Sequence, residues 1–412
     1  MNIEKCRICG DTDLSMFLDL GSHPMADAFI EESRLSEQEP FNPLQVCSCP
    51  ECGLIQLNHV IPATQLYDEN YIYESSTTLM GQRHWAEFAK TAAEIAQLKP
   101  GDLVIDIGSN VGTLLEKFRD QGAEILGVDP APTIVDIALE RGIETINGFF
   151  NLETASRIRD ERKRAKIITA TNVFAHIDDL HATMTAIAHL LAADGVFIVE
   201  APYVPNLVKS LEYDTIYHEH LSYFSLKPLI KLFGQYDMEI IDVQQRDIHG
   251  GSFRCYVRRT SHRPTNVSNV VNDLLLLEQE CGIYNLEYLH HFAADVADHR
   301  DQLVTMLRSL KAEGRKIAAV SAPAKGMTLL NYGHIGADIL DFITEKSTLK
   351  IGRYSPGQHI PIVADVKLME CKPDYALLLA WNFAGEIMEN LSDYLRAGGK
   401  FIIPIPKPHI FG

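Results

Sequence analysis

Between residues 103 and 202 the sequence alternates short apolar runs with helical segments, and this alternation constrains the fold more than any other feature. The apolar runs are LVIDIG, EILGVD, KIITATNVF and VFIVEAP, each of the length of a buried strand. Strands and helices in this order predict right-handed crossovers. The sequence therefore predicts an α/β fold with a doubly wound, Rossmann-like parallel sheet.

Two further runs, MEIIDVQQRD and GGSFRCYVRR, predict a terminal hairpin that closes this unit near residue 260. A helical stretch follows and ends near residue 314. A second alternating run, from KIAAVSAPAKG to KFIIPIP, then predicts a C-terminal α/β unit. We therefore expect three domains, with boundaries at residues 1–75, 76–260 and 261–412.

A chain of 412 residues is too long for one ordinary core, which agrees with several domains. Its net charge of -18 argues against a general nucleic-acid binder, because phosphate contacts need clustered Lys and Arg. No apolar run reaches membrane-spanning length, and the first ten residues lack the order of a signal peptide. We therefore expect a cytoplasmic protein with no nucleic-acid or membrane partner. We favour a monomer, although the sequence leaves the oligomeric state open.

Five of the eight cysteines lie in the first 52 residues, in a loop-rich segment too small to stabilise itself easily. Cys6 and Cys9 form one Cys-x-x-Cys pair, and Cys49 and Cys52 form a second. Two such pairs supply the four thiolates of a closed tetrahedral zinc site, which has a structural role. Cys47, two residues before Cys49, fits a strand neighbour better than a ligand. The sequence therefore predicts a small zinc-binding N-terminal domain.

A glycine loop, Asp106-Ile-Gly108-Ser-Asn110-Val-Gly112, follows the first strand of the central unit. It differs from the Gly-x-Gly-x-x-Gly dinucleotide pattern, because an acid stands first and the glycines are four residues apart. An acid at this place suits a cationic amino-acid head group, and Asp129, at the end of the next strand, suits ribose hydroxyls. The loop therefore favours S-adenosylmethionine over NAD.

Two other segments follow strand ends, where ligands bind in open parallel sheets. In INGFFN, Phe149 or Phe150 either lines the adenine pocket or belongs to the core. In NVFAHIDDL, which begins at Asn172, His176 either faces the reacting centre or caps the helix that begins near Asp178.

The segment from Asp214 to Ser225, DTIYHEHLSYFS, crowds proton-transfer groups after the strand VFIVEAP. An imidazole oriented by a carboxylate is a competent general base near neutral pH. In an extended strand, Tyr217 and Glu219 would point to one side and His218 and His220 to the other. The pattern leaves open which histidine acts, and a purely structural polar network is the alternative.

Together these motifs resemble the sugar C-methyltransferases that act on nucleotide-linked 4-keto-deoxysugars. The resemblance covers nearly the whole chain, from CRICG and CPECGLIQL through YHEH to PAKGMTLLNY and LLLAWNFAGEI. It implies a zinc-binding domain, a methyltransferase core and a C-terminal α/β domain, with the nucleotide sugar between the last two. It also implies catalytic residues, which are the base His220 with Glu219, Tyr217, His176 and Tyr71.

The family usually has a tyrosine-glycine-alanine run before alanine-lysine-glycine, whereas this chain has Ser321-Ala-Pro-Ala-Lys325-Gly326. Lys325 and the helix that starts there suit the diphosphate of a thymidine- or guanosine-linked sugar. The implied reaction is methylation of a sugar carbon, C-3, through an enolate. The alternatives are an NAD-dependent nucleotide-sugar oxidoreductase or epimerase, and an oxygen or nitrogen methyltransferase for a small molecule. An RNA-modifying methyltransferase and a non-catalytic zinc-ribbon module fit the acidic balance poorly.

Overall fold

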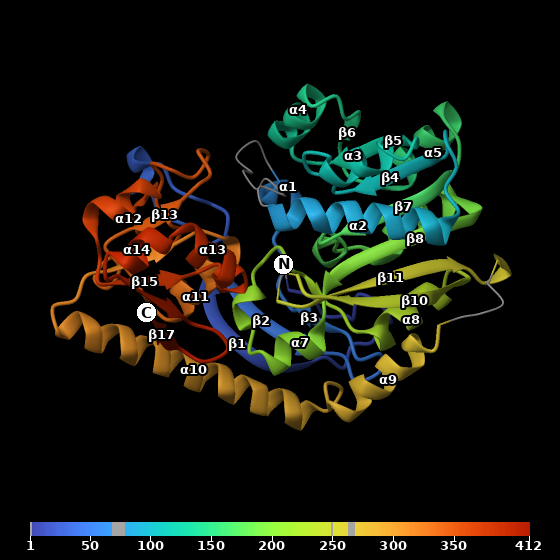
Figure 1. The fold of residues 1–412 in the computed structure, drawn as a ribbon. Coiled ribbons are helices and arrows are strands. Elements are labelled where there is room, and N and C mark those ends of the chain that lie inside the picture. The colour runs from blue at the N-terminus through green and yellow to red at the C-terminus, as the bar shows by residue number, and fades with distance from the viewer. Residues whose placement is uncertain (1, 68–78, 249, 263–267) are drawn as a thin grey trace.

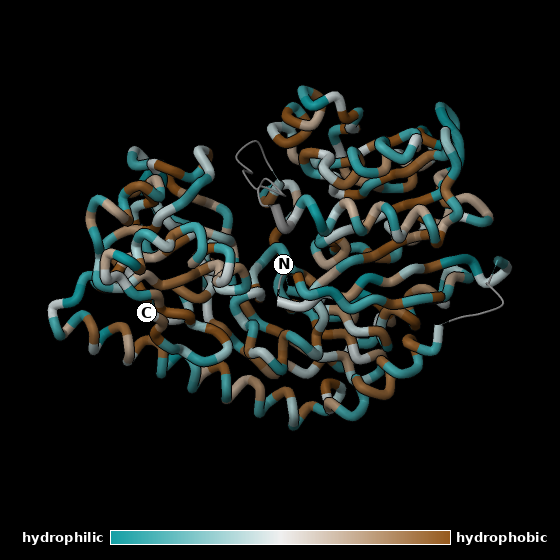
Figure 2. The backbone as a smooth tube through the Cα atoms, viewed as in Figure 1, coloured by the Kyte–Doolittle hydropathy of each residue, from teal (hydrophilic) through white to brown (hydrophobic). Residues whose placement is uncertain are grey.

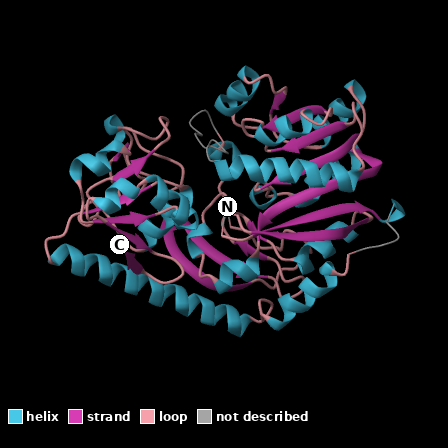
Figure 3. Ribbon diagram, in the orientation of Figure 1, coloured by secondary structure: helices cyan, strands magenta, loops and turns pink. Residues whose placement is uncertain are grey.

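The computed structural model describes residues 2–67, 79–248, 250–262 and 268–412, and its strands form three sheets (Figure 1). Helices flank the sheets on both sides (Figure 3). The predicted boundary near residue 75 falls outside the described residues, and both predicted boundaries stay predictions. None of the helices in the described residues has the length and apolar composition needed to cross a membrane.

The central sheet has seven strands in the order β10-β11-β8-β7-β4-β5-β6. Pairing is parallel from β8 to β6, whereas β11 runs antiparallel to both β8 and β10. The doubly wound sheet and the terminal hairpin are thereby confirmed. The strands are β4 (Leu103–Ile107), β5 (Glu124–Asp129), β6 (Thr145–Asn147), β7 (Ala165–Thr171), β8 (Leu191–Pro202), β10 (Met238–Arg246) and β11 (Ser252–Arg259).

Successive residues of β4 point to opposite faces of this sheet, as a strand requires. Ile105 packs with residues of α6 and α8 on one face, and Val104 packs with residues of α2 and α3 on the other. The helices of this unit are α2 (Leu79–Ala96), α3 (Thr113–Arg119), α4 (Pro132–Glu140), α5 (Leu152–Glu161), α6 (Leu180–Leu190), α7 (Val204–Lys209) and α8 (Leu226–Gly234), with short 3-10 helices at Phe174–His176, Tyr213–Thr215 and Thr260–His262.

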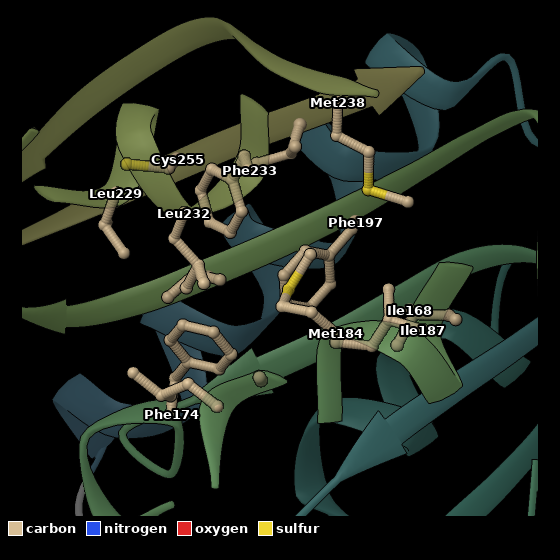
Figure 4. Packing of buried hydrophobic residues seen from close by; sticks show 14 of the residues in the cluster. Ile168, Phe174, Met184, Ile187, Phe197, Leu229, Leu232, Phe233, Met238 and Cys255 are labelled. Atoms are coloured by element: carbon tan, nitrogen blue, oxygen red, sulfur yellow. The ribbon is translucent and has the colours of Figure 1, made fainter. Parts of the chain in front are cut away.

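Aromatic rings fill the face of the sheet that carries α6 and α8 (Figure 4). The ring of Phe197 lies 5.8 Å from that of Phe174 and 6.0 Å from that of Phe233, between centroids. All three side chains are fully buried, and each such ring adds a large apolar area to the core. Since Phe174 belongs to the 3-10 helix that also holds His176, this packing fixes the place of that histidine.

The N-terminal segment is more regular than the expected loop-rich domain. It forms an antiparallel sheet in the order β1-β2-β3-β9, and β9 comes from the central unit, directly after the YHEH segment. The sequence hid these strands because β1 is broken by two register shifts and β3 and β9 are very short. The elements are β1 (Ser15–His23), β2 (Asn42–Ser48), β3 (Ile55–Leu57), β9 (Ser222–Tyr223), α1 (Ala63–Leu66) and a 3-10 helix at Glu32–Arg34.

The predicted helical stretch after the central unit is two helices, α9 (Val270–Glu280) and α10 (Leu286–Ala312). A six-stranded sheet in the order β14-β13-β12-β15-β16-β17 follows, parallel except for β17, which the sequence did not predict. Its elements are β12 (Ile317–Val320), α11 (Ala324–Tyr332), β13 (Ile343–Glu345), β14 (Ile362–Ala364), α12 (Val366–Cys371), β15 (Tyr375–Leu378), a 3-10 helix at Trp381–Phe383, α13 (Ala384–Asn390), α14 (Ser392–Arg396), β16 (Lys400–Ile403) and β17 (His409–Phe411).

One hydrophobic cluster joins all three parts of the chain. It holds residues of the N-terminal sheet, of the segment from Tyr213 to Tyr223, and of the C-terminal sheet. Helix α10 runs along the lower edge of the molecule and contacts β1, and α11 contacts both β1 and the 3-10 helix Tyr213–Thr215 (Figure 1). The apolar strands lie inside and the polar faces of the long helices lie outside (Figure 2). The segment with the YHEH motif therefore lies where the three parts meet.

Candidate active site

The glycine loop turns from β4 into α3 at the carboxyl edge of the central sheet. Gly108 and Gly112 have φ angles of 64° and 79°, a left-handed conformation that glycine adopts without strain. A Cβ atom at Gly108 would lie 2.5 Å from Val173, and one at Gly112 would lie 2.6 Å from Ile143. Both positions therefore need glycine, which keeps the backbone close to the space where a ligand binds.

Two buried acids lie at this edge. The Asp106 carboxyl accepts a hydrogen bond from Thr169 Oγ1 at 2.6 Å, and burial raises its pKa to about 7. Asp129 accepts hydrogen bonds from the N–H groups of Asn110 at 2.9 Å and Ala131 at 3.0 Å, and burial raises its pKa as well. Each Asp129 oxygen keeps a lone pair for a ligand hydroxyl. These residues fit a sulfonium cofactor with an amino-acid head group and a ribose.

The two phenylalanines after β6 lie in different surroundings. Phe150 is buried in the core, whereas Phe149 is 42% exposed, and Phe149 is thus the ring that is free to stack on adenine. Asn172, after β7, has a φ of 54° and donates its N–H to the Glu200 carbonyl at 2.8 Å. Its side chain lines the cavity that also holds His176.

This cavity, of about 230 Å³, is the candidate catalytic cavity. Its walls come from the carboxyl edge of the central sheet, the YHEH segment, the loop after β1 and the start of α11. The site residues predicted from the sequence that line it are Asn172, His176, Tyr217, Glu219, His220 and Lys325. The structure thus brings side chains from all three parts of the chain around one space.

The YHEH segment is a turn and not the extended strand that the alternation assumed. His220 Nε2 lies 2.7 Å from the Tyr217 hydroxyl, three residues earlier, and His220 Nδ1 lies 2.7 Å from the Thr215 carbonyl oxygen. A carbonyl only accepts, so Nδ1 carries the proton and Nε2 is the basic nitrogen. The two ring nitrogens thus contact Tyr217 and Thr215, and the role of Glu219 in orienting this ring stays a prediction.

His218 points away from the catalytic cavity. Its Nε2 donates to the carbonyl oxygens of Asn42 and Pro43 at 3.2 Å, and burial lowers its pKa to about 4. Its ring therefore anchors the segment to β2. Of the two histidines that the sequence left open, His220 is the one that lines the cavity.

His176 lies next to His220, with 5.0 Å between ring centroids. It does not cap α6, because Asp179 does so by accepting from the Ala182 N–H at 2.8 Å. His176 Nδ1 lies 2.8 Å from the Tyr67 hydroxyl, its Nε2 has no hydrogen-bond partner in the described part of the chain, and burial lowers its pKa.

Tyr71, the tyrosine that the family resemblance implied at the zinc-domain junction, lies outside the described residues. Tyr67, four residues earlier, is the tyrosine that the structure brings to His176. Tyr67 could not be identified from the sequence, because a single aromatic residue in an irregular segment forms no recognisable motif. The one indication that Tyr67 contributes to the site was its position near the end of the N-terminal part, close to the expected domain junction.

The C-terminal unit brings Lys325 to the cavity. Its Nζ lies 3.8 Å from Asp214 Oδ2 and 3.8 Å above the Trp381 ring, and burial lowers its pKa. Ser321 has a φ of 68° at the end of β12, and Gly326 packs so closely that a Cβ would lie 2.8 Å from Leu379. Neither is among the described residues that line the cavity.

The four predicted zinc ligands come together. The Sγ atoms of Cys6, Cys9, Cys49 and Cys52 all lie within 4.8 Å of one another. A regular tetrahedron with zinc–sulfur bonds of about 2.3 Å has edges of about 3.8 Å, so the set fits zinc without an open position. Cys47 lies in β2, outside the set, as predicted.

The loop between Cys6 and Cys9 also contacts the segment from Asp214 to Ser225. Arg7, between Cys6 and Cys9, is buried and donates from Nη1 to the carbonyl oxygen of Leu221 at 3.2 Å. Its Nε lies 3.1 Å from Asp178 Oδ1. The metal site therefore supports the residue that follows His220.

Comparisons with known proteins agree with this architecture. Three family descriptions match the chain: a zinc binding domain over residues 6–67, a methyltransferase domain over 81–243 and a C-methyltransferase C-terminal domain over 247–406. The C-methyltransferase NovU of Streptomyces niveus is 36% identical over 408 residues, which cover 99% of this chain and 97% of NovU.

Shorter matches are confined to part of the chain. A ubiquinone biosynthesis O-methyltransferase of Azorhizobium caulinodans is 26% identical over 118 residues, 28% of this chain and 45% of that protein. The crystal structure of magnesium protoporphyrin IX methyltransferase from Synechocystis PCC 6803 is 14% identical, covers 45% of this chain and 90% of that one, and has a TM-score of 0.36.

The full-length match to NovU sets aside the NAD-dependent and the oxygen or nitrogen alternatives. The three matched segments follow one another in the order zinc site, cofactor edge and C-terminal unit. The chain belongs to the C-methyltransferase family and is an S-adenosylmethionine-dependent C-methyltransferase with a structural zinc site.

Proposed function

We propose that this enzyme methylates C-3 of a nucleotide-linked 4-keto-deoxysugar through an enolate, with His220 as the base. The observation that carries the proposal is the pair of hydrogen bonds that fixes His220 in the cavity wall. A hydrogen on the carbon beside a ketone is acidic because its anion is an enolate, so a neutral imidazole is a suitable base.

The Thr215 carbonyl holds the proton on Nδ1, which leaves Nε2 to accept the C-3 proton. The C–H bond breaks, its electron pair forms the enolate, and the negative charge develops on the 4-keto oxygen. The Tyr217 hydroxyl, which contacts Nε2 in this structure, is placed to turn to that oxygen and donate a hydrogen bond. This exchange would free Nε2 at the moment when it is needed.

When bound, S-adenosylmethionine supplies the electrophilic methyl group. The residues of its edge, Asp106, Asp129 and the glycine loop, would hold the head group and the ribose, and the exposed ring of Phe149 would stack on adenine. The enolate carbon would then take the methyl group, and the electrons of the broken carbon–sulfur bond would leave with the sulfur. Holding the enolate carbon next to the methyl donor would supply much of the rate.

Lys325 is our candidate for the diphosphate, together with the start of α11. The lysine comes from the C-terminal unit while the base comes from the central unit, so a sugar nucleotide would bridge the two. Ser321 and Gly326 would then shape the β12–α11 turn. We expect either thymidine or guanosine as the nucleoside.

The test measures hydrogen–deuterium exchange at C-3 and methyl transfer, with a panel of 4-keto nucleotide sugars. His220→Gln should lower both rates by roughly 10²–10⁴. The matched control is His218→Gln, two residues away and outside the cavity, which should keep both rates per folded molecule.

Two results would overturn the proposal. Exchange at the wild-type rate in His220→Gln would remove this residue from the role of base. Methylation of no 4-keto nucleotide sugar in the panel would remove the substrate class, provided that the protein binds S-adenosylmethionine in the same preparation.

A further inference from the structure

Asp27, in the loop after β1, is an acid with a nearly buried side chain, and it belongs to none of the sequence motifs described above. Its side chain is 8% exposed, and its Oδ1 has no hydrogen-bond partner among the described residues. It lines the catalytic cavity and also a second cavity of about 350 Å³ on the N-terminal side. A carboxylate oxygen buried without a hydrogen bond is costly, so its position calls for a partner in function.

Glu219 lines the same two cavities. It comes from the turn that carries His220, whereas Asp27 comes from the N-terminal part of the chain. The two carboxyl groups thus belong to the wall that both cavities share. Burial first, and then the charge of Asp27, raise the pKa of Glu219 well above its usual value.

One cation faces this pair. Lys350 Nζ lies 3.6 Å from Asp27 Oδ1, donates to the Ala322 carbonyl at 2.8 Å and lies 4.6 Å from the Phe29 ring centroid. Its charge lowers the pKa of Glu219 but does not outweigh burial. Two acids with one cation leave one negative charge in excess, which a single retained proton removes.

The other titratable groups nearby have partners of their own. In the second cavity, Arg34 pairs with Glu37 at 2.9 Å and Arg353 lies 3.7 Å from Glu31. Glu39, the remaining acid of that cavity, contacts His359 at 2.5 Å. In the catalytic cavity the titratable groups are His176, Tyr217, His220 and Lys325, and the Tyr67 hydroxyl lies close enough for both acids to raise its pKa, after burial.

We propose that Asp27 and Glu219 share one proton, and that Glu219 stays a neutral acid which donates a hydrogen bond to an oxygen of the bound substrate. The proton resides on Glu219 because Lys350 lies against Asp27 and favours its anion. Asp27 is then a positioning residue, and Glu219 is the group that touches substrate. The acceptor, an oxygen of the sugar, rests on the function proposed above.

The first test is the pH profile of kcat/KM. Activity falls at high pH when Glu219 loses its proton. Asp27→Asn removes the anion that retains this proton, so the fall should move to lower pH by about one unit or more. Lys350→Gln removes the opposing cation, so the fall should move to higher pH. The control is Glu31→Gln. Of the two cavities Glu31 lines only the second, so this variant should leave the pH at which kcat/KM falls unchanged.

A rescue separates proton donation from a structural role. A glutamine at position 219 keeps an N–H donor and cannot ionise. The double variant Asp27→Asn with Glu219→Gln should therefore regain activity at high pH, at least tenfold above Asp27→Asn alone. Variants with equal activity at high pH would overturn the proposal, as would shifts of the two single variants in the same direction.

Infrared spectroscopy tests the proton without any substrate. With carbon-13-labelled glutamate, the wild type near pH 8 should show the carbonyl band of one buried carboxylic acid that Glu219→Gln lacks. Asp27→Asn should lose this band and Lys350→Gln should keep it. If the wild type lacks the band, the proton sharing is wrong even when sugar methylation is found. If the band behaves as expected but no sugar is methylated, the proposed substrate is what fails.

Discussion

Two buried clusters of charged side chains differ in how acids and bases balance. The Glu200 cluster consists of Glu200, Arg254 and His84, so its one buried acid has two basic partners, and the exposed Glu87 lies 3.4 Å from Arg254 as well. The Asp27 cluster consists of Asp27, Glu219 and Lys350, and it has two acids for one base. Both clusters are largely buried, and Asp27 and Glu219 of the second line the catalytic cavity.

In the Glu200 cluster both carboxylate oxygens are engaged. Arg254 Nε contacts Glu200 Oε2 at 2.7 Å, and His84 Nε2 contacts Oε1 at 2.6 Å. Burial alone would raise the pKa of Glu200, but these two partners lower it below its usual value. The Arg254 guanidinium also lies 3.9 Å from the Phe88 ring centroid. This cluster ties α2, β8 and β11 together.

The comparison teaches that burial alone does not distinguish structural acids from acids of the candidate active site. What distinguishes them is whether every carboxylate oxygen has a hydrogen-bond or ion-pair partner. A buried acid with every oxygen engaged holds elements together, and its removal leaves buried charge behind. A buried acid with a missing partner stores free energy that a ligand or a shared proton can release. Four changes, ordered by the expected change in the free energy of unfolding, test this distinction.

Removal of zinc should have the largest effect. The four thiolates resemble the Glu200 cluster, because each buried anion has a positively charged partner, which here is the metal ion. Loss of the ion, or Cys49→Ser, should cost about 10 kcal/mol and unfold the N-terminal sheet. Metal content and circular dichroism after chelation check this, and activity should disappear with the sheet. The spare thiol provides the control, since Cys47→Ser should keep the metal.

Glu200→Gln should come next, with a loss of about 3–5 kcal/mol, because it leaves the buried Arg254 without its carboxylate. Urea denaturation measures the loss. Glu124→Gln, in a surface pair with Arg162, should cost less than about 1 kcal/mol. A loss as small as this control in Glu200→Gln would erase the contrast between the clusters.

Asp106→Asn should stabilise the protein without cofactor. The pKa of Asp106 is about 7 in the folded state, above its usual value, so the folded state binds the extra proton and stability falls as pH rises toward 7. The amide removes this penalty and still accepts from Thr169. We expect a gain of about 4 kcal/mol at pH 8 and little change near pH 4.

The same substitution should lower the affinity for the cofactor, although it raises the stability of the protein. In Asp106→Asn, calorimetry should show weaker binding of S-adenosylmethionine, since the carboxylate that would face its head group is gone. Equal stability gains at pH 4 and pH 8 would show that the acid titrates normally, and would place Asp106 outside the class of under-satisfied groups.

Asp27→Asn should have the smallest effect on folding, within about 1 kcal/mol at pH 7, because Glu219 then takes over as the partner of Lys350. The same urea titration measures it. A loss as large as that of Glu200→Gln would mean that Asp27 belongs to the scaffold.

The sequence predicted the features that follow local rules. The glycine loop, the parallel sheet and the zinc set depend on spacing or periodicity, and the structure reproduces them. The turn at Tyr217–His220 was missed, because alternation was assumed where the chain folds back on itself. Asp27 and Tyr67 were missed for another reason, since their partners Glu219 and His176 are distant in sequence and only the tertiary fold joins them.

Strand β9 gives the molecule an unusual dependence on its own first residues. Its two residues pair with β3, and Arg7 reaches the carbonyl directly after His220. A chimaera that exchanges residues 1–67 between relatives would therefore replace the strand and the arginine that contact the segment after His220, along with the zinc ligands. Recombination libraries should therefore exchange residues 1–67 together with the segment from Asp214 to Ser225. Hybrids that combine these two segments from different relatives should still be expressed but should have low activity.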